Sequence, residues 1–345
     1  MPTSAKKRAL LIVAGLVCVI AAGAGAYFYR LRRPLAGTNA GAEPSILSQL
    51  PAGAPAVAYV DVAALRKLQG SQLAAVLGLA GADPQQDRDY KDFVAGTGFD
   101  YERDLDKVAL AIWPMSATKP GAPLGESRIM AIAEGRFDRD KIKAYALRSG
   151  EHVTQGAQSF YEVPGNPPVS FAFLSPTRIL LTNAKGLSIL ALLPSAAETE
   201  AMRARIERVA GAPIFAVART DTLPPDVYAN FRNAPQFESL ARSVEGLTLA
   251  GQPEGDLIHV ALDAECDSMK NALELSTLLD GFRMFGTMAL SDPKTRAQMT
   301  KEQAVFLAAL AKRGKVTNQD HWVRLTLDIT PDMLASPAPS HADPH

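Results

Sequence analysis

The feature that most restricts the fold of this chain is an uncharged apolar stretch close to its N-terminus. Ala9 to Tyr29 contains no charged residue, and Arg8 and Arg30 stand at its two ends. With a rise of about 1.5 Å per residue, a helix of this length spans about 31 Å, which matches the hydrocarbon core of a bilayer. We therefore expect a single-pass transmembrane helix, which with its flanking basic residues occupies residues 1–33.

A cleaved signal peptide is the alternative interpretation of the same stretch. Lys6, Lys7 and Arg8 form a basic n-region, and the small residues of 22–26 fit a cleavage site. The hydrophobic run continues to Tyr29 and more arginines follow it, which favours an uncleaved anchor. A short basic N-terminus before a large domain usually stays in the cytoplasm, so we expect the folded domain on the outer, periplasmic side of the cytoplasmic membrane. After cleavage it would be exported.

The rest of the chain is acidic and poor in cysteine. The sequence has 36 basic and 36 acidic residues, but six basic and no acidic residues lie within residues 1–33, which leaves 30 basic against 36 acidic residues in 34–345. An acidic domain repels phosphate backbones, so we expect no nucleic-acid partner. Cys18 and Cys266 can form neither a disulfide framework nor a cysteine-rich zinc site.

Hydrophobic periodicity predicts an α+β fold with mainly antiparallel sheets over residues 46–335. A linker rich in proline, glycine and alanine (34–45) precedes this part, and a tail of disordered composition (336–345) follows it. The expected strands are 57–60, 108–113, 128–134, 160–163, 169–174, 178–182, 214–218, 246–250, 256–263 and 322–329. The expected helices are 63–79, 89–94, 138–148, 187–193, 225–243, 267–290 and one that opens with a capping box at Thr300.

The order of these elements recurs, which predicts two divergent copies of one α+β unit, at 46–200 and 201–335. Gly211-Ala212-Pro213 stands before a strand as Gly53-Ala54-Pro55 does, and placing 134–138 over 263–267 aligns both strand-to-helix junctions. A single irregular α+β domain is the alternative.

Several short segments of the first unit also carry a family resemblance. These segments are Leu50-Pro51-Ala52, Tyr59-Val60-Asp61, Thr97-Gly98-Phe99-Asp100, Asp104-Leu105 and Gly135-Arg136-Phe137-Asp138. Together they resemble uncharacterised, membrane-anchored bacterial envelope proteins with a duplicated α+β ectodomain, mainly over residues 46–190. The resemblance implies an envelope location and a duplicated fold, and it implies no catalytic residues.

Motifs of the common enzyme classes are absent from the sequence. It contains no P-loop, no complete dinucleotide-binding glycine pattern, no Gly-x-Ser-x-Gly and no His-Glu-x-x-His. Two of the five histidines lie in the tail, and His152, His259 and His321 are far apart in sequence. We therefore expect structural or surface roles for these histidines, and no catalytic residue, cofactor or metal.

One acidic set fits part of a calcium-loop template. Asp263, Glu265, Asp267 and Glu274 occupy its positions 1, 3, 5 and 12, but Ser268 stands where the sharp turn needs glycine. We expect instead that Asp267 or Ser268 caps the long helix.

The second acidic set is Asp100, Glu102, Asp104 and Asp106. Closely placed carboxylates can act as acid and base when their environments differ. Because basic residues are interleaved among these four, we expect a solvated turn.

The long helix over 267–290 carries a broad apolar stripe. Leu275, Leu278, Phe282 and Phe285 recur at helical spacing, and Met284 widens the stripe beyond one face. Ordinary core packing explains most of it. A hydrophobic groove for lipid or a partner helix, lined by these four residues, is the functional alternative.

The sequence therefore favours a non-enzymatic binding or scaffolding module of the bacterial cell envelope, held at the membrane by its N-terminal helix. Its expected partner is an envelope protein or a lipid. The alternative is a binder of a hydrophobic ligand, either a lipid or a lipoprotein. An enzyme with an unrecognised site is the third hypothesis.

Overall fold

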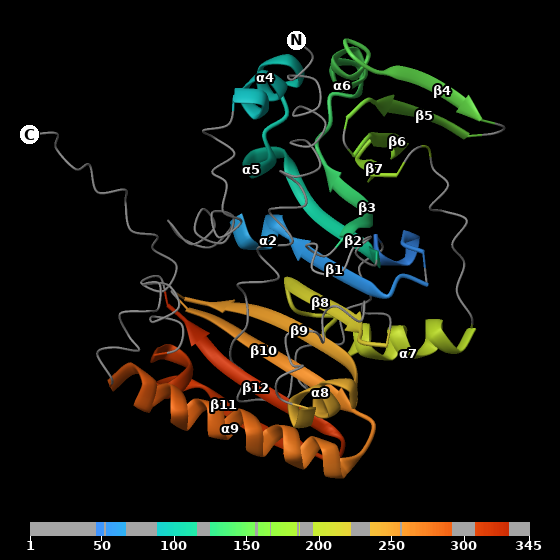
Figure 1. Ribbon diagram of the computed structural model, residues 1–345. Coiled ribbons are helices and arrows are strands. Elements are labelled where there is room, and N and C mark those ends of the chain that lie inside the picture. The colour runs from blue at the N-terminus through green and yellow to red at the C-terminus, as the bar shows by residue number, and fades with distance from the viewer. Residues whose placement is uncertain are drawn as a thin grey trace, which may run out of the picture.

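We analysed a computed structural model of the chain, shown in Figure 1. The residues that it describes are 46–51, 53–66, 88–115, 125–155, 158–165, 167–184, 186, 196–221, 235–255, 257–291 and 308–330. The expected transmembrane segment Ala9–Tyr29 lies outside them. Among the helices within them, none combines the length and the apolar character that crossing a bilayer requires.

The described strands form one twelve-stranded sheet in which every neighbouring pair is antiparallel. Its strands are β1 (Ala56–Asp61), β2 (Leu105–Met115), β3 (Gly125–Gly135), β4 (Glu151–Gln155), β5 (Gln158–Val163), β6 (Val169–Ser175), β7 (Arg178–Thr182), β8 (Ile214–Arg219), β9 (Val244–Glu254), β10 (Leu257–Cys266), β11 (Lys315–Gln319) and β12 (Trp322–Ile329). Their spatial order is β11-β12-β10-β9-β8-β1-β2-β3-β7-β6-β5-β4. The predicted α+β class with antiparallel pairing is confirmed.

The two strands at the centre of the sheet, β1 and β8, explain how it stays continuous. Most of β1 is buried on both faces, which suits its nearly unbroken apolar sequence. Val57 and Tyr59 contribute to one core, and Ala58 and Val60 contribute to the other. The short side chain of Ala58 pairs with that of Ala216 across the junction of the two strands.

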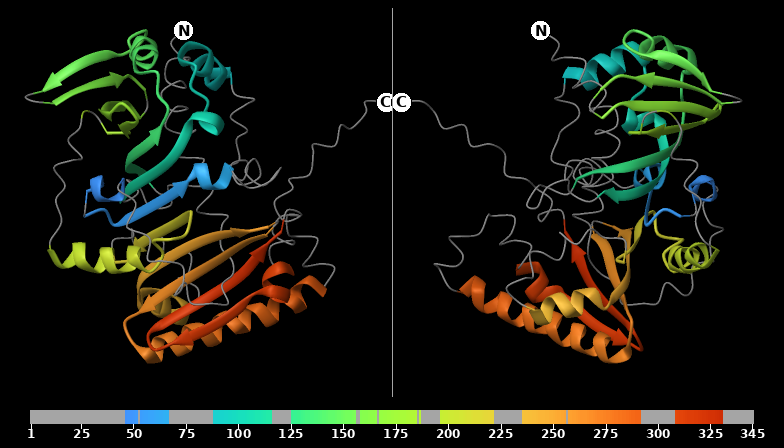
Figure 2. Two further views of the ribbon diagram at one scale, coloured as in Figure 1. Left: turned by 180° about the vertical axis from the view of Figure 1, so that it is seen from behind. Right: turned by 45° about the vertical axis from the view of Figure 1, so that its right-hand side comes forward.

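Helices cover both faces of the sheet (Figure 2). Their bounds are η1 (Leu47–Gln49), α2 (Val62–Arg66), α4 (Arg88–Thr97), α5 (Tyr101–Asp104), α6 (Arg139–Ala146), α7 (Ala196–Glu207), α8 (Pro235–Arg242) and α9 (Met269–Ser291). Leu65 of α2 and Ile142 of α6 join the core under Ala58, whereas Met202 of α7 joins the core on the opposite face. Ala272 of α9 packs on β10 and β12 in the second half of the sheet.

Most of the expected elements are present, with shifted ends. The strands β2, β3, β9 and β10 extend further than expected, and β12 has the expected bounds. The sequence patterns missed β4, β11, α7 and the short helices η1 and α5. The expected boundary after residue 200 falls within α7. The helix expected over 187–193 lies outside the described residues, as do most of 63–79 and the start of 225–243. The helix expected to open at Thr300 is described only over residues 308–313, where the chain is helical.

The two halves of the sheet follow the same pairing order, β1-β2-β3-β7-β6 and β8-β9-β10-β12-β11. In each half, the strand before the helix ends in an equivalent hydrogen bond, from Gly135 N to Thr177 O at 2.9 Å and from Cys266 N to His321 O at 2.8 Å. Glu134 immediately precedes Gly135 as Glu265 precedes Cys266. The junctions therefore match two residues away from the expected alignment, which placed residue 134 over 263.

Candidate functional site

The apolar stripe of α9 lies partly against the sheet. Leu275 and Leu279 pack beside Ala272 on the second half of the sheet, and Leu278 is half-buried. The side chains of Phe282 and Phe285 lie outside the described part of the structure. The hydrophobic groove expected along Leu275, Leu278, Phe282 and Phe285 stays a prediction.

The outer side of α9 exposes large apolar side chains. Met269 is 67% exposed, Leu273 is 59% exposed and Met284 is 68% exposed. They lie on one side of the helix, because residues 4 and 15 positions apart return to nearly the same direction. We call these three residues the α9 apolar face. Among the described residues, only Leu147 and Leu174 are large hydrophobic residues of comparable exposure.

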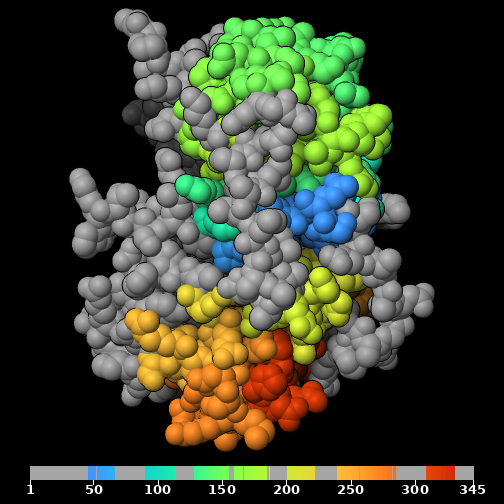
Figure 3. Space-filling model, turned by 90° about the vertical axis from the view of Figure 1, so that its right-hand side faces the viewer, coloured from blue at the N-terminus to red at the C-terminus, as the bar shows by residue number. Residues whose placement is uncertain are grey.

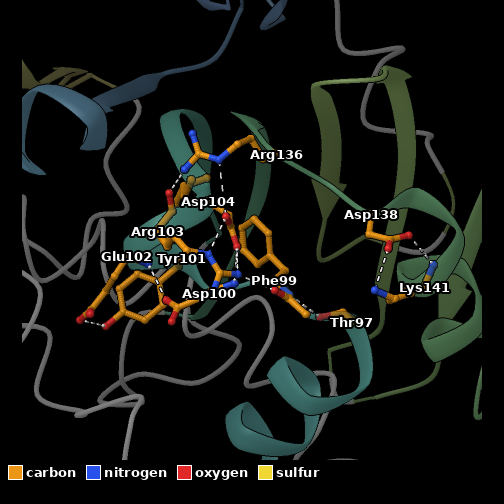
Figure 4. A network of polar contacts seen from close by, with 12 residues as sticks. Thr97, Phe99, Asp100, Tyr101, Glu102, Arg103, Asp104, Arg136, Asp138 and Lys141 are labelled. Atoms are coloured by element: carbon orange, nitrogen blue, oxygen red, sulfur yellow. Dashed lines mark hydrogen bonds and ion pairs between the residues drawn. The ribbon is translucent and has the colours of Figure 1, made fainter.

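The second acidic set, Asp100 to Asp106, forms a network around the short helix α5 (Figure 4). The Asp100 carboxylate caps this helix by accepting a hydrogen bond from Glu102 N at 3.0 Å. In return, the backbone N–H of Asp100 donates to Asp104 Oδ2 at 3.0 Å. These two residues therefore close the turn reciprocally.

Arginines from three places bind the carboxylates at the end of this turn. Arg103 donates to both oxygens of Asp104, at 2.9 and 2.5 Å, and Arg136 lies 3.5 Å from the same carboxylate. Arg66 and Arg136 lie 3.3 and 3.6 Å from Asp106. The expected solvated turn is wrong for Asp104, which is buried. With these carboxylates bound by guanidinium groups, the network joins α2, α5 and the end of β3.

The Asp104 carboxyl should make the stability of the fold sensitive to acid. The hydrogen bond from Arg103 lowers its pKa below the ordinary value of about 3.9, so its contribution is complete above that value and is lost as the pH falls through the lower, folded-state pKa. We expect Asp104→Asn to flatten the dependence of the urea midpoint on pH below pH 4. Asp140→Asn is the control, because that side chain is 94% exposed, and it should keep the wild-type slope. Equal slopes for wild type and Asp104→Asn would contradict the assignment.

The calcium-loop residues do not converge on one site. Asp263 pairs with Arg324, Glu265 with Arg205, and Asp267 accepts a hydrogen bond from the side chain of Asn271 at 2.7 Å. Glu274 lies 3.8 Å from Lys270 on the exposed side of α9. Ser268 caps the helix by accepting from Asn271 N, as expected. Within the described ranges, no three His, Cys, Asp or Glu side chains are placed to hold a metal ion.

A row of mostly charged side chains, with one threonine and one tryptophan among them, crosses the second half of the sheet on the face opposite α9. Its members, which we call the charged strip, are Thr248 of β9, Asp263 and Glu265 of β10, Trp322 and Arg324 of β12, and Arg205 and Arg208 at the end of α7. Alternation along β10 places Asp263 and Glu265 on this face, because Val260 and Ala264 belong to cores on the other face.

Two close ion pairs hold the strip together. Arg324 donates to both oxygens of Asp263, at 2.5 and 2.6 Å, and the Asp263 residue is 3% exposed. This hydrogen bonding raises the pKa of Arg324 further above its already high value. Arg205 Nε donates to Glu265 Oε2 at 2.6 Å. Gly246 makes room for that pair, since an added Cβ would lie 2.7 Å from Arg205 Cζ.

Arg208 is held differently from the other two arginines. Its guanidinium carbon lies 3.8 Å from the centre of the Trp322 ring, a cation–π contact. Its closest charged partner is Asp263, with Arg208 Nη2 at 3.8 Å from Oδ2, and its side chain is 40% exposed. Figure 3 shows this side of the molecule, where the yellow-green residues of α7 border the red residues of β12.

His259 lies on the same face as the strip, between two carboxylates. Its Nδ1 is 2.6 Å from the buried Asp328, and its Nε2 is 2.8 Å from the exposed Glu254. The orientation expected for His259, away from Ile258 and Val260, is confirmed.

Comparison with known proteins gives little further information. No family model matches the chain, and no curated protein matches it. Solved structures of TP0453 match with low scores. Crystal form III has a TM-score of 0.43 at 9% identity, covering 82% of this chain and 92% of that chain. Crystal form IV has a TM-score of 0.41 at 10% identity, covering 81% and 90%. These matches do not narrow the class of protein. The fold itself defines an α+β protein with one large antiparallel sheet.

Proposed function

We propose that the chain is a non-enzymatic binding or scaffolding module of the bacterial cell envelope. Ala9–Tyr29 would anchor it as a single transmembrane helix, and residues 34–45 would link that helix to a domain outside the cytoplasm. The length and lack of charge of Ala9–Tyr29 support the anchor. The similarity to membrane-anchored envelope proteins seen in the sequence is compatible with this location.

We also propose that the domain arose by duplication. The register of the central strands supports this. When Gly53-Ala54-Pro55 is matched to Gly211-Ala212-Pro213, Ala58 and Ala216 are equivalent residues, and they lie directly opposite each other in β1 and β8. The flanking hydrogen bonds are also related by exchange of the two strands, with Asp61 N to Pro213 O at 2.7 Å and Arg219 N to Pro55 O at 2.8 Å. Two copies of one unit would thus be joined edge to edge in a single sheet.

The α9 apolar face is the observation that carries the binding role. Burying a side chain such as Leu273 or Met284 at an interface gains about 1.5–3 kcal/mol, and exposing it to water forgoes that gain. Three such side chains on one side of one helix provide enough apolar surface for a partner to recognise. The carboxylates of the charged strip and of the Asp104 network, in contrast, are paired with arginines within the domain.

The test is purification of the full-length protein in mild detergent, with analysis of both co-purifying proteins and bound lipids. We expect an envelope protein at near-stoichiometric yield. Leu273→Gln combined with Met284→Gln should reduce that yield at least tenfold. Leu174→Gln, on β6 and 46% exposed, is the matched control and should not change it. Circular dichroism and thermal unfolding of each variant establish that folding is intact.

Two other outcomes would redirect the proposal. A co-purifying lipid that is lost when Phe282 and Phe285 are made polar, with folding intact, would favour the hydrophobic-ligand alternative. A protein partner that is retained equally by the α9 variant and by the control would remove the α9 apolar face as its binding surface.

A further inference from the structure

The charged strip stands where the other half of the sheet is apolar. Asp263 lies two residues before Glu265, as Ile132 lies two residues before the matched Glu134. Each has a cross-strand partner, which is Arg324 for Asp263 and Leu180 for Ile132. All four positions lie on central strands of their half, and Ile132 and Leu180 are buried in the core that contains Met202. The same place in the sheet therefore accommodates either an apolar pair or an ion pair.

Packing alone does not account for the charged version. A buried ion pair commonly stabilises a fold no more than an apolar pair of similar volume. The strip also holds Thr248 at the position of Ala109, and the buried Thr248 hydroxyl makes no hydrogen bond to any residue that the structure describes. Burying a hydroxyl without a partner costs stability, whereas an alanine there costs none. Charged and polar residues at these positions therefore point to a role other than stabilising the sheet.

The strip has one guanidinium group more than it has carboxylates. Arg205 is matched by Glu265 and Arg324 by Asp263, each at hydrogen-bonding distance. Arg208 is left with an ion pair at 3.8 Å, and its guanidinium donates no hydrogen bond to another described residue. The same face carries Asp328 and Glu254 beside His259, so this excess positive charge is confined to the Arg208 end of the strip.

Two arginines of the strip converge on one point. Arg208 Nη2 and Arg324 Nη2 both approach Asp263 Oδ2, at 3.8 and 2.6 Å. Arg324 uses Nε and Nη2 on Asp263, which leaves the donors of its Nη1, and its side chain is 27% exposed. Because Arg324 already neutralises Asp263, an approaching anion would meet the unmatched charge of Arg208.

We propose that this end of the strip is a binding site for a phosphate group, held by the guanidinium groups of Arg208 and Arg324 beside the Trp322 ring. The planar fork of a guanidinium matches the oxygens of a phosphate, and such charge-assisted hydrogen bonds are among the stronger ones in proteins. Contact with Trp322 orients Arg208 before binding, which lowers the entropy that binding would cost. The phosphate belongs either to the head group of a lipid or to a free small molecule. This site lies on the opposite face of the sheet from α9 and does not depend on the proposed α9 interface.

The chain contains a built-in reporter of this binding. It has two tryptophans, Trp113 and Trp322, so the Trp113→Phe protein reports from Trp322 alone. Titration of the full-length Trp113→Phe protein with inorganic phosphate, at constant ionic strength in chloride, should change the emission of Trp322 saturably. Arg208→Gln should weaken the apparent affinity at least tenfold. Arg139→Gln is the matched control, since Arg139 makes a similar contact with Phe173 in the first half, and it should leave the affinity unchanged.

Calorimetric titration of the same variants covers the case in which Arg208→Gln alters the emission of Trp322 by itself. A linear fluorescence response, or the same phosphate affinity in Arg208→Gln and the parent, would overturn the proposal. Short-chain phosphatidic acid and phosphatidylcholine distinguish the two sources. Tighter binding of phosphatidic acid than of inorganic phosphate, with none of phosphatidylcholine, would assign the site to a lipid head group. Equal binding of phosphatidic acid and inorganic phosphate would assign it to a free phosphate compound.

Discussion

Arg324→Leu should lower the free energy of unfolding by about 3–5 kcal/mol, which is the range for removing one partner of a buried ion pair. The substitution leaves the Asp263 carboxylate with its backbone neighbours and with Arg208 at 3.8 Å, in a residue that is 3% exposed. Asp263→Ile should cost a similar amount, because it leaves the Arg324 guanidinium on a sheet face without its carboxylate. Urea unfolding followed by circular dichroism measures both changes.

The double variant Asp263→Ile with Arg324→Leu should recover most of this loss. It installs the pair that occupies the corresponding place in the first half, where Ile132 and Leu180 are cross-strand partners in a close-packed core. Apolar pairs that replace a buried ion pair are often neutral or stabilising, so the coupling energy in the double-mutant cycle should be about 3 kcal/mol or more. If the two single changes simply add, Asp263 and Arg324 do not depend on each other.

The same double variant separates stability from binding. It removes one of the two guanidinium groups proposed to hold phosphate, while it leaves Arg208 and Trp322 in place. A protein as stable as the parent but with weakened phosphate binding would show that the ion pair is present for the ligand. A protein as stable as the parent with unchanged phosphate binding would mean that, of the two arginines, only Arg208 binds the phosphate.

Local pattern was sufficient to predict most of the fold. Strands with clear alternation, such as 322–329, and helices with a capping residue, such as Asp138 before α6, were predicted with small errors at their ends. The edge strands β4 and β11 were missed because most of their residues are polar, as suits strands with one unpaired edge. Helix α7 was missed because alanine, glutamate and arginine make up most of it. Only Met202 and Ile206, four positions apart, form its apolar stripe, and they pack in the core.

The charged strip could not be predicted, because its partners are distant in sequence. Asp263 and Arg324 are 61 residues apart, and Arg205 and Glu265 are 60 apart. Only the register of β10 against β12, together with the placement of α7, brings them together. The sequence did show the acidic residues of the strip, but they fitted a calcium template because the arginines that bind them were not local. The groove expected along α9, in contrast, was inferred from helical spacing alone, and it stays a prediction.

Gly135→Ala should lower the free energy of unfolding by about 3 kcal/mol. A Cβ added at Gly135 would overlap the carbonyl oxygen of Asp104, at the end of α5, and lie 3.2 Å from Leu105 Cα, at the start of the paired strand β2; both are backbone atoms. Overpacking against atoms that can move costs about 1–3 kcal/mol, and this backbone has little freedom because Asp104 O accepts from Arg136 N at 2.8 Å. The matched residue of the second half is Cys266, which carries a buried side chain at the same point of the strand.

Gly211→Ala is the matched control for this prediction. Nothing lies within 4 Å of a Cβ added at Gly211, and its backbone is outside the left-handed region, so alanine should be neutral or stabilise by about 0.4–1 kcal/mol through the unfolded chain. Urea unfolding of the two variants beside the parent gives the comparison. Similar midpoints for Gly135→Ala and Gly211→Ala would mean that β2 can move away from β3 at this junction. The Asp104 network would then not fix the backbone at this junction. Loss of the contacts of Arg136 with Asp104 should in that case have an equally small effect on the free energy of unfolding.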